Sequence, residues 1–146
     1  MRLLAVCSTM AVAVCLFAPG GTVRGDTTDP MERLLDAIAQ VESRSDPNAV
    51  GDSGRAIGVY QIHRCYWQDG TRILGVDWTY RDASDPARAR QVVRAYLRHY
   101  GRDRSLIDMA RIHNGGPKGH EKRSTQDYAR KIEAILNGEA EPRLAG

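Results

Sequence analysis

The residue best suited to acid catalysis in this sequence is Glu42. Apolar residues recur at Leu34, Leu35, Ile38 and Val41, which is the spacing of one face of an α-helix. Glu42 follows Ile38 by four positions, so it continues this apolar face at the C-terminal end of the helix, where the helix dipole is negative. Partial burial and the negative dipole end both disfavour the ionised carboxylate. The pattern therefore predicts a protonated glutamic acid that serves as a general acid. A helix-end glutamate in a solvent-exposed salt bridge is the alternative.

Two later segments combine aromatic side chains, amides and glycines. They are residues 58–69 (GVYQIHRCYWQD) and residues 110–119 (ARIHNGGPKG). Aromatic faces suit the C–H surface of a sugar and amides suit its hydroxyls, while the glycines after Asn114 let the backbone approach a ligand closely. We therefore expect a sugar-binding cleft. The expected binding residues are Ser43, Tyr60, Gln61, Trp67, His113, Asn114, Gly115 and Tyr128.

Several of these residues also have a purely structural interpretation. Tyr60, Trp67 and Tyr128, taken singly, are more often core residues than sugar platforms. Gln61 could satisfy buried backbone groups, although a role in lining the cleft is favoured. His113 continues the apolar side of its helix, which slightly favours a structural histidine. The four histidines lack metal-ligand spacing, so no metal and no cofactor are expected.

Three motifs in order along the chain carry a family resemblance. They are Glu42-Ser43, then Gly58-x-Tyr60-Gln61-Ile62 with Tyr66-Trp67-x-Asp69, then Arg111-Ile112-His113-Asn114-Gly115-Gly116-Pro117 with Thr125-x-x-Tyr128. With these motifs the sequence resembles the invertebrate-type lysozymes, or destabilases, from about residue 34 to residue 132. Residues 47–58 also resemble the soluble lytic transglycosylases. Both resemblances imply a lysozyme-like fold.

The resemblance implies a glycosidase that cleaves the β-1,4 bond between N-acetylmuramic acid and N-acetylglucosamine in peptidoglycan. Glu42 would be the acid, and Asp52 in a D-x-G turn would be the second carboxylate, which retaining glycosidases hold about 5 Å away. Asp52 could equally serve only as a turn residue. Asp69 and Asp77 compete with it, and Asp69 is expected to cap or bond a loop. Lytic transglycosylases use the glutamate alone and release anhydro-muropeptides.

Two observations limit how far the resemblance extends. Invertebrate-type lysozymes are usually rich in disulfides, whereas Cys65 is the only cysteine after residue 15. The sequence thus resembles a disulfide-poor relative, and it shows no strong serine–histidine pair for the isopeptidase activity credited to some destabilases. A non-catalytic peptidoglycan-binding module is the alternative from another functional class.

The composition indicates one small exported domain. Residues 1–25 resemble a secretory signal peptide, residues 26–138 are expected to form the catalytic domain, and residues 139–146 a flexible tail. Secretion, or export to the periplasm, would follow. The formal charge of +3 includes Arg2 and Arg24; without them, 19 basic residues face 18 acidic ones. This balance argues against a nucleic-acid partner. We expect a monomer that acts on glycan strands, with no membrane contact after signal removal.

The helices that must position these residues are predicted from their caps and periodicity. Asp29 and Pro30 start the first helix, which runs to about Ser43. Further helices are expected over 86–100, 106–115 and from about 124 to 137, with a possible short helix over 61–67. Turn residues cluster over 46–84, where a small hairpin or irregular loop is expected. The predicted fold class is α+β and mostly α, with about five helices.

Overall fold

The structure, a computed structural model, describes residues 29–138. The predicted signal peptide and tail lie outside the described residues. No described helix is long and apolar enough to cross a membrane. Within the described range there are five α-helices and three two-residue strands, which confirms the predicted fold class. The elements are α1 Pro30–Ser43, β1 Val50–Gly51, β2 Ala56–Ile57, β3 Ile62–His63, α2 Arg64–Leu74, α3 Pro86–Tyr100, α4 Leu106–Gly115 and α5 Gln126–Leu136.

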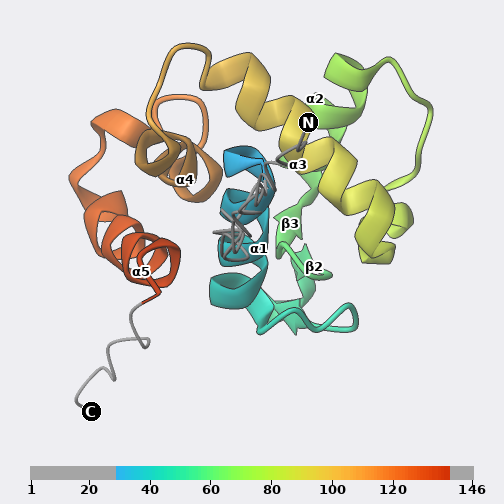
Figure 1. Cartoon of the computed structure of the whole chain (residues 1–146). Helices are drawn as coiled ribbons and strands as arrows, with labels where there is room; N and C mark the ends of the chain where they lie inside the picture. Colours follow the sequence, from blue (N-terminus) through green and yellow to red (C-terminus); the bar gives the residue numbers. More distant parts are fainter. Residues whose placement is uncertain (1–28, 139–146) are drawn as a thin grey trace, which may run out of the picture.

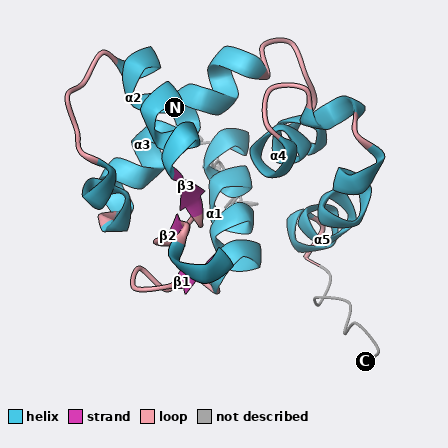
Figure 2. Cartoon of the chain, turned by 180° about the vertical axis from the view of Figure 1, so that it is seen from behind, coloured by secondary structure: helices cyan, strands magenta, loops and turns pink. Residues whose placement is uncertain are grey.

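Helix α1 is the central element of the fold. Figure 1 shows α4 and α5 on one side of it and the strands, α2 and α3 on the other, and the reverse view in Figure 2 shows the same arrangement. The predicted start is confirmed, because the Asp29 carboxylate accepts a hydrogen bond from the Met31 amide at 3.0 Å. Leu34, Leu35 and Ile38 are fully buried, as their periodicity predicts. The apolar face of α1 therefore forms the centre of the core and fixes where Glu42 emerges.

The strands form a small antiparallel sheet in the order β1-β2-β3. Val50 pairs with Ile57, and Ala56 pairs with His63. The turn between β1 and β2 is a 3₁₀ turn, Asp52–Gly54, so the hairpin expected around these residues is confirmed. Asp52 has a φ of 49°, in the left-handed region that aspartate tolerates better than most residues. The sheet thus holds the Asp52 turn beside the end of α1.

The short helix expected over residues 61–67 starts too early and ends too early compared with the helix in the structure. Helix α2 begins at Arg64, because Ile62 and His63 pair with β2, and it runs to Leu74. It packs closely on α3 at Gly70, where a Cβ would lie only 2.5 Å from Cγ1 of Val92. Gly70 therefore allows the close approach of α2 and α3, and the cleft-facing side of α2 is set by this contact.

The other three helices agree with the sequence predictions apart from one boundary. The Asp85 carboxylate caps α3, and the Ser105 hydroxyl accepts from the Asp108 amide at the start of α4. Helix α5 begins at Gln126 because Arg123–Thr125 forms a separate 3₁₀ turn. The Thr125 hydroxyl is buried there and donates to the loop that follows α4. This loop and α4 carry the third motif to the side of α1 that faces the cleft.

Candidate active site

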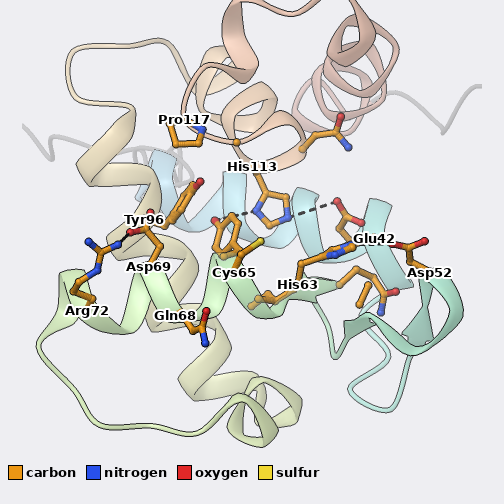
Figure 3. A pocket seen from close by; sticks show the side chains of 16 residues that line it. Glu42, Asp52, His63, Cys65, Gln68, Asp69, Arg72, Tyr96, His113 and Pro117 are labelled. Atoms are coloured by element: carbon orange, nitrogen blue, oxygen red, sulfur yellow. Dashed lines mark hydrogen bonds and ion pairs between the residues drawn. The ribbon is translucent and has the colours of Figure 1, made fainter.

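A cleft of about 760 Å³ runs past the C-terminal end of α1. Figure 3 shows Asp52 and Glu42 toward one end and Asp69 and Arg72 at the other, with His113 between them. The walls come from the sheet, α2, α3, α4 and the loop after α4. The lining residues are Glu42, Asp52, Ala56, Gln61, Ile62, His63, Cys65, Tyr66, Gln68, Asp69, Arg72, Tyr96, His113, Asn114, Gly116 and Pro117.

Glu42 lies at the base of the cleft with its side chain only 19% exposed. It comes from the last turn of α1, as the sequence predicted. The next residue, Ser43, does not line the cleft; its hydroxyl donates to the Val59 carbonyl oxygen at 2.8 Å. This bond joins the end of α1 to the loop between β2 and β3. Ser43 therefore fixes the backbone that carries Glu42.

The imidazole of His113 lies between Glu42 and Tyr66. Its Nε2 is 3.5 Å from the Glu42 carboxylate, and its Nδ1 is 3.2 Å from the Tyr66 hydroxyl (Figure 3). The His113 side chain is 5% exposed, so these contacts are shielded from solvent. When the Tyr66 hydroxyl donates to Nδ1, the proton of a neutral imidazole resides on Nε2 and faces Glu42. The arrangement places a nitrogen of the buried imidazole beside the Glu42 carboxyl group.

Tyr66 is a buried phenol that stays protonated. Its ring stacks on Tyr96, with the centroids 3.8 Å apart. Burial, and to a lesser degree the neighbouring Tyr96 and Glu42, raise the pKa of Tyr66 well above its usual range. Tyr66 therefore remains available as a hydrogen-bond donor to His113 at any pH near neutrality.

A second buried phenol, Tyr128 of α5, lies beside Glu42 and away from the cleft. Its hydroxyl is buried and completes no hydrogen bond among the described residues. Burial is the main cause that raises the pKa of Tyr128 well above its usual range, and the adjacent Glu42 carboxylate adds to it. Tyr128 does not line the cleft. It thus places an O–H donor beside Glu42 without offering a face to a sugar.

Asp52 borders the same cleft in a different environment. Its side chain is 44% exposed, and its carboxylate lies 2.8 Å from Nη2 of Arg55 and 3.4 Å from Nε2 of His63. The cleft thus contains a shielded carboxyl group beside a histidine and an exposed carboxyl group beside an arginine.

Asp69 is held by its neighbours at the opposite end of the cleft. The Tyr100 hydroxyl donates to it at 2.5 Å, and Arg72 forms an ion pair with it. The Tyr100 bond joins α2 to α3, so Asp69 links two helices and does not bond a loop as the sequence analysis expected.

The remaining predicted residues divide between the cleft and the core. Gln61 and Asn114 line the cleft, although the Gln61 amide also donates to the Ala49 and Gly58 carbonyls. Tyr60 is 2% exposed and Trp67 is 1% exposed, so neither presents a free ring face to a ligand. Both belong to the hydrophobic core cluster.

Gly115 has a packing role in the described structure. It does not line the cleft, and a Cβ there would lie 2.7 Å from Cγ2 of Thr125. The close contact between α4 and the 3₁₀ turn before α5 requires this glycine. Its neighbours Gly116 and Pro117 reach the cleft instead.

The sequence analysis missed one wall of the cleft. Four α2 residues at the spacing of one helical face line it: Cys65, Gln68, Asp69 and Arg72. Their positions follow the i, i+3, i+4, i+7 pattern of a polar stripe, which was visible in the sequence but was obscured by the wrong start of this helix. Among the described residues, no three histidine, cysteine or acidic side chains converge as metal ligands.

Comparison with known proteins gives a consistent family match. The sequence model of the Destabilase family matches residues 31–135. Lysozyme 1 of Crassostrea virginica is 34% identical over 109 residues, which cover 70% of this chain and 58% of the relative. A lysozyme of Ostrea edulis is 42% identical over 81 residues, covering 51% and 58% of the two chains. The chain thus spans little more than half the length of these curated relatives.

Solved structures show the same fold. The inhibitor-bound lysozyme of Meretrix lusoria superimposes with a TM-score of 0.62 and 28% identity, over 75% of this chain and 94% of that one. The Tapes japonica lysozyme gives the same TM-score and coverage at 24% identity, a likeness that concerns the fold alone. The predicted lysozyme-like fold is therefore confirmed.

Proposed function

Because the chain belongs to the Destabilase family, we propose that it is a lysozyme-type glycoside hydrolase acting on peptidoglycan. Its substrate would be the β-1,4 bond between N-acetylmuramic acid and N-acetylglucosamine. The lysozymes among its relatives support this class of reaction. The elongated cleft, with an acid at one end and polar groups along its length, supports a glycan-strand substrate.

The observation that carries the proposal is the position of Glu42. Its carboxyl group is shielded at the base of the cleft, with His113 3.5 Å away and the buried Tyr128 hydroxyl beside it. In its protonated form, Glu42 donates a proton to the glycosidic oxygen as the C–O bond breaks, so the leaving sugar departs as a neutral alcohol. The resulting Glu42 carboxylate then accepts a proton from the attacking water.

Asp52 is proposed as the second carboxylate. As the bond breaks, positive charge develops at the anomeric carbon, and an ionised carboxylate on the open side of the cleft stabilises or traps that centre. The position of Asp52 on the border of the cleft, with its side chain 44% exposed, supports this role. Gln61 and Asn114 are proposed to hydrogen-bond the sugar, since both line the cleft.

A lytic transglycosylase is the second candidate. The ion pair between Asp52 and Arg55 is a reason to retain this candidate. The Arg55 guanidinium offsets part of the negative charge that a nucleophilic carboxylate needs. In that reaction Glu42 works alone, and the muramoyl 6-hydroxyl attacks the anomeric carbon in place of water. The product is then an anhydro sugar, lighter by one water than the hydrolysis product.

One experiment tests both the activity and its type. The protein is incubated with purified peptidoglycan, the turbidity is followed, and the released muropeptides are analysed by mass spectrometry. We expect clearing of the suspension and reducing-end products, and we expect Glu42→Gln to abolish both while its circular dichroism spectrum stays unchanged. Retained clearing by Glu42→Gln would contradict the assignment, and anhydro products would select the transglycosylase. Binding without any clearing would indicate a non-catalytic wall-binding module.

Export and assembly state belong to the same proposal. We propose that the chain is exported by its N-terminal segment, residues 1–25, and acts as a monomer outside the cytoplasm. The absence of a membrane-spanning helix among the described residues is compatible with this location. Mass spectrometry of the exported protein would show whether the chain begins near residue 26.

A further inference from the structure

A groove branches from the cleft at His63 and Cys65. It consists of two neighbouring hollows of about 320 and 600 Å³. The first shares His63 and Cys65 with the cleft, and the second shares Arg64 and Tyr80 with the first. We call this feature the side groove; it is lined by residues 54–55, 63–65 and 79–81.

The side groove carries two arginines without acidic partners. Neither Arg64 nor Arg81 forms an ion pair with any described residue, and both are exposed. The Arg64 guanidinium lies over the Tyr80 ring, 4.6 Å from its centroid. The Tyr80 hydroxyl in turn donates to the Ile62 carbonyl at 2.7 Å. Arg64 is thus held against a fixed aromatic ring, with its charge directed to solvent.

The two acidic residues that contact the lining of the side groove, Asp52 and Asp82, are already paired. Asp52 contacts Arg55 and His63 at the junction with the cleft. Asp82 accepts from the Thr79 hydroxyl at 2.8 Å and pairs with Arg88. Their negative charges are offset locally, so the unpaired charge in the side groove is positive. The groove therefore suits an anionic ligand.

We propose that the side groove binds the acidic stem peptide attached to the muramoyl residue of peptidoglycan, while the glycan strand occupies the cleft. This inference rests on the proposed function. The stem peptide leaves the sugar sideways through its lactyl ether and carries free carboxylates. A branched ligand of this kind matches a cleft with a branch at His63 and Cys65. Arg64 and Arg81 then pair with the peptide carboxylates, for which guanidinium groups offer fitting donor geometry.

A binding experiment tests this assignment without depending on cleavage. The full chain carrying Glu42→Gln is titrated with an N-acetylmuramoyl tripeptide and, separately, with N-acetylmuramic acid, and amide signals are followed by NMR. We expect the tripeptide, but not the sugar alone, to shift the signals of Arg64 and residues 79–81. The double variant Arg64→Gln/Arg81→Gln should bind the tripeptide about fivefold more weakly, the size expected for exposed ion pairs.

The matched control is Arg102→Gln/Arg104→Gln. It removes the same charge from the exposed loop between α3 and α4, which lines neither the cleft nor the side groove. We expect this control to bind the tripeptide as the parent does. An equal loss in the control would mean that overall charge causes the effect, and would overturn the proposal. Inorganic phosphate shifting the same signals at the same concentration would mark a general anion site and overturn it as well.

A cleavage assay completes the test in the protein with Glu42 intact. On intact peptidoglycan we expect kcat/KM of the Arg64→Gln/Arg81→Gln variant to fall about fivefold. On glycan strands stripped of their peptides, kcat/KM of the variant should equal that of the unmodified protein. An equal loss on both substrates would overturn the proposal. The two proposals can fail separately. If the protein binds the tripeptide in the side groove but releases no sugar fragments, the stem-peptide site is supported and the glycosidase assignment is contradicted.

Discussion

The Nε2 atom of His113 lies 3.5 Å from the Glu42 carboxylate, although α4 and α1 carry the two residues far apart in the sequence. The imidazole is shielded from solvent and is contacted on its other side by the Tyr66 hydroxyl. Both ring nitrogens therefore face protein groups, although the imidazole also lines the cleft. We interpret His113 as a residue that positions Glu42.

Two substitutions at position 113 separate positioning from packing. A glutamine amide can reach the place of Nε2 and keep a donor near Glu42, whereas an asparagine amide reaches only the place of Nδ1 beside Tyr66. We expect His113→Asn to lower kcat on peptidoglycan about 100-fold, the lower range for a misaligned acid–base group, and His113→Gln to lower it much less. The pH–rate profile should shift only in the asparagine variant. Equal kcat losses with equal falls in melting temperature would indicate that His113 serves packing alone.

Substitution of Asp52 tests whether a second carboxylate takes part. Asp52→Asn keeps the shape of the side chain and removes its charge, and we expect kcat to fall at least about 100-fold if a charged or nucleophilic group is needed. Because Asp52 is exposed, its ion pair should contribute less than about 1 kcal/mol to the free energy of unfolding. Asp69→Asn, at the other end of the cleft, is the control and should keep most of the activity. Full activity of Asp52→Asn would favour the transglycosylase.

Three buried phenols predict a loss of stability at alkaline pH. Burial raises the pKa of Tyr96 to about 12 and raises the pKa values of Tyr66 and Tyr128 well above 10. In the unfolded chain a tyrosine titrates near pH 10, so above that pH the unfolded state releases protons that the folded state retains. The tyrosine contribution is therefore constant below about pH 10 and decreases as the pH rises further.

Urea unfolding at a series of pH values from 8 to 11 measures this dependence. We expect the free energy of unfolding to decline more shallowly above about pH 10 in Tyr96→Phe than in the parent protein, because the variant has one phenol fewer to titrate. The comparison concerns slopes, so a uniform loss of stability from the substitution does not affect it. Superimposable slopes would show that Tyr96 titrates alike in the folded and unfolded states.

Substitution of Trp67 tests whether this aromatic residue packs in the core or binds the substrate. Its ring is 1% exposed, and its indole N–H donates to the Trp78 carbonyl at 3.2 Å. Trp67→Phe loses this bond and leaves a small cavity, so we expect the free energy of unfolding to fall by about 1–3 kcal/mol with KM unchanged. A higher KM at unchanged stability would instead place Trp67 against the sugar.

Local patterns were enough to predict most of the helices and the position of the acid. Asp29 and Pro30 fix the start of α1, and its apolar periodicity determines that Glu42 leaves the last turn on the buried side. Such features depend on residues within a few positions of one another, so the sequence displays them directly. The start of α2 was misplaced because the pairing of Ile62 with Ile57 is a contact between strands, which no helical pattern reveals.

The sequence by itself indicated the fold class and the family, and it placed Glu42 at the end of the first helix. Only the tertiary structure decided which motif residues meet in the cleft: it buried Tyr60 and Trp67 in the core, and it placed His113 against Glu42. The physical reason is that periodicity specifies which face of an element is apolar but not which other element covers it. The cleft and its side groove are formed by elements distant in sequence, whose packing is fixed by the whole core.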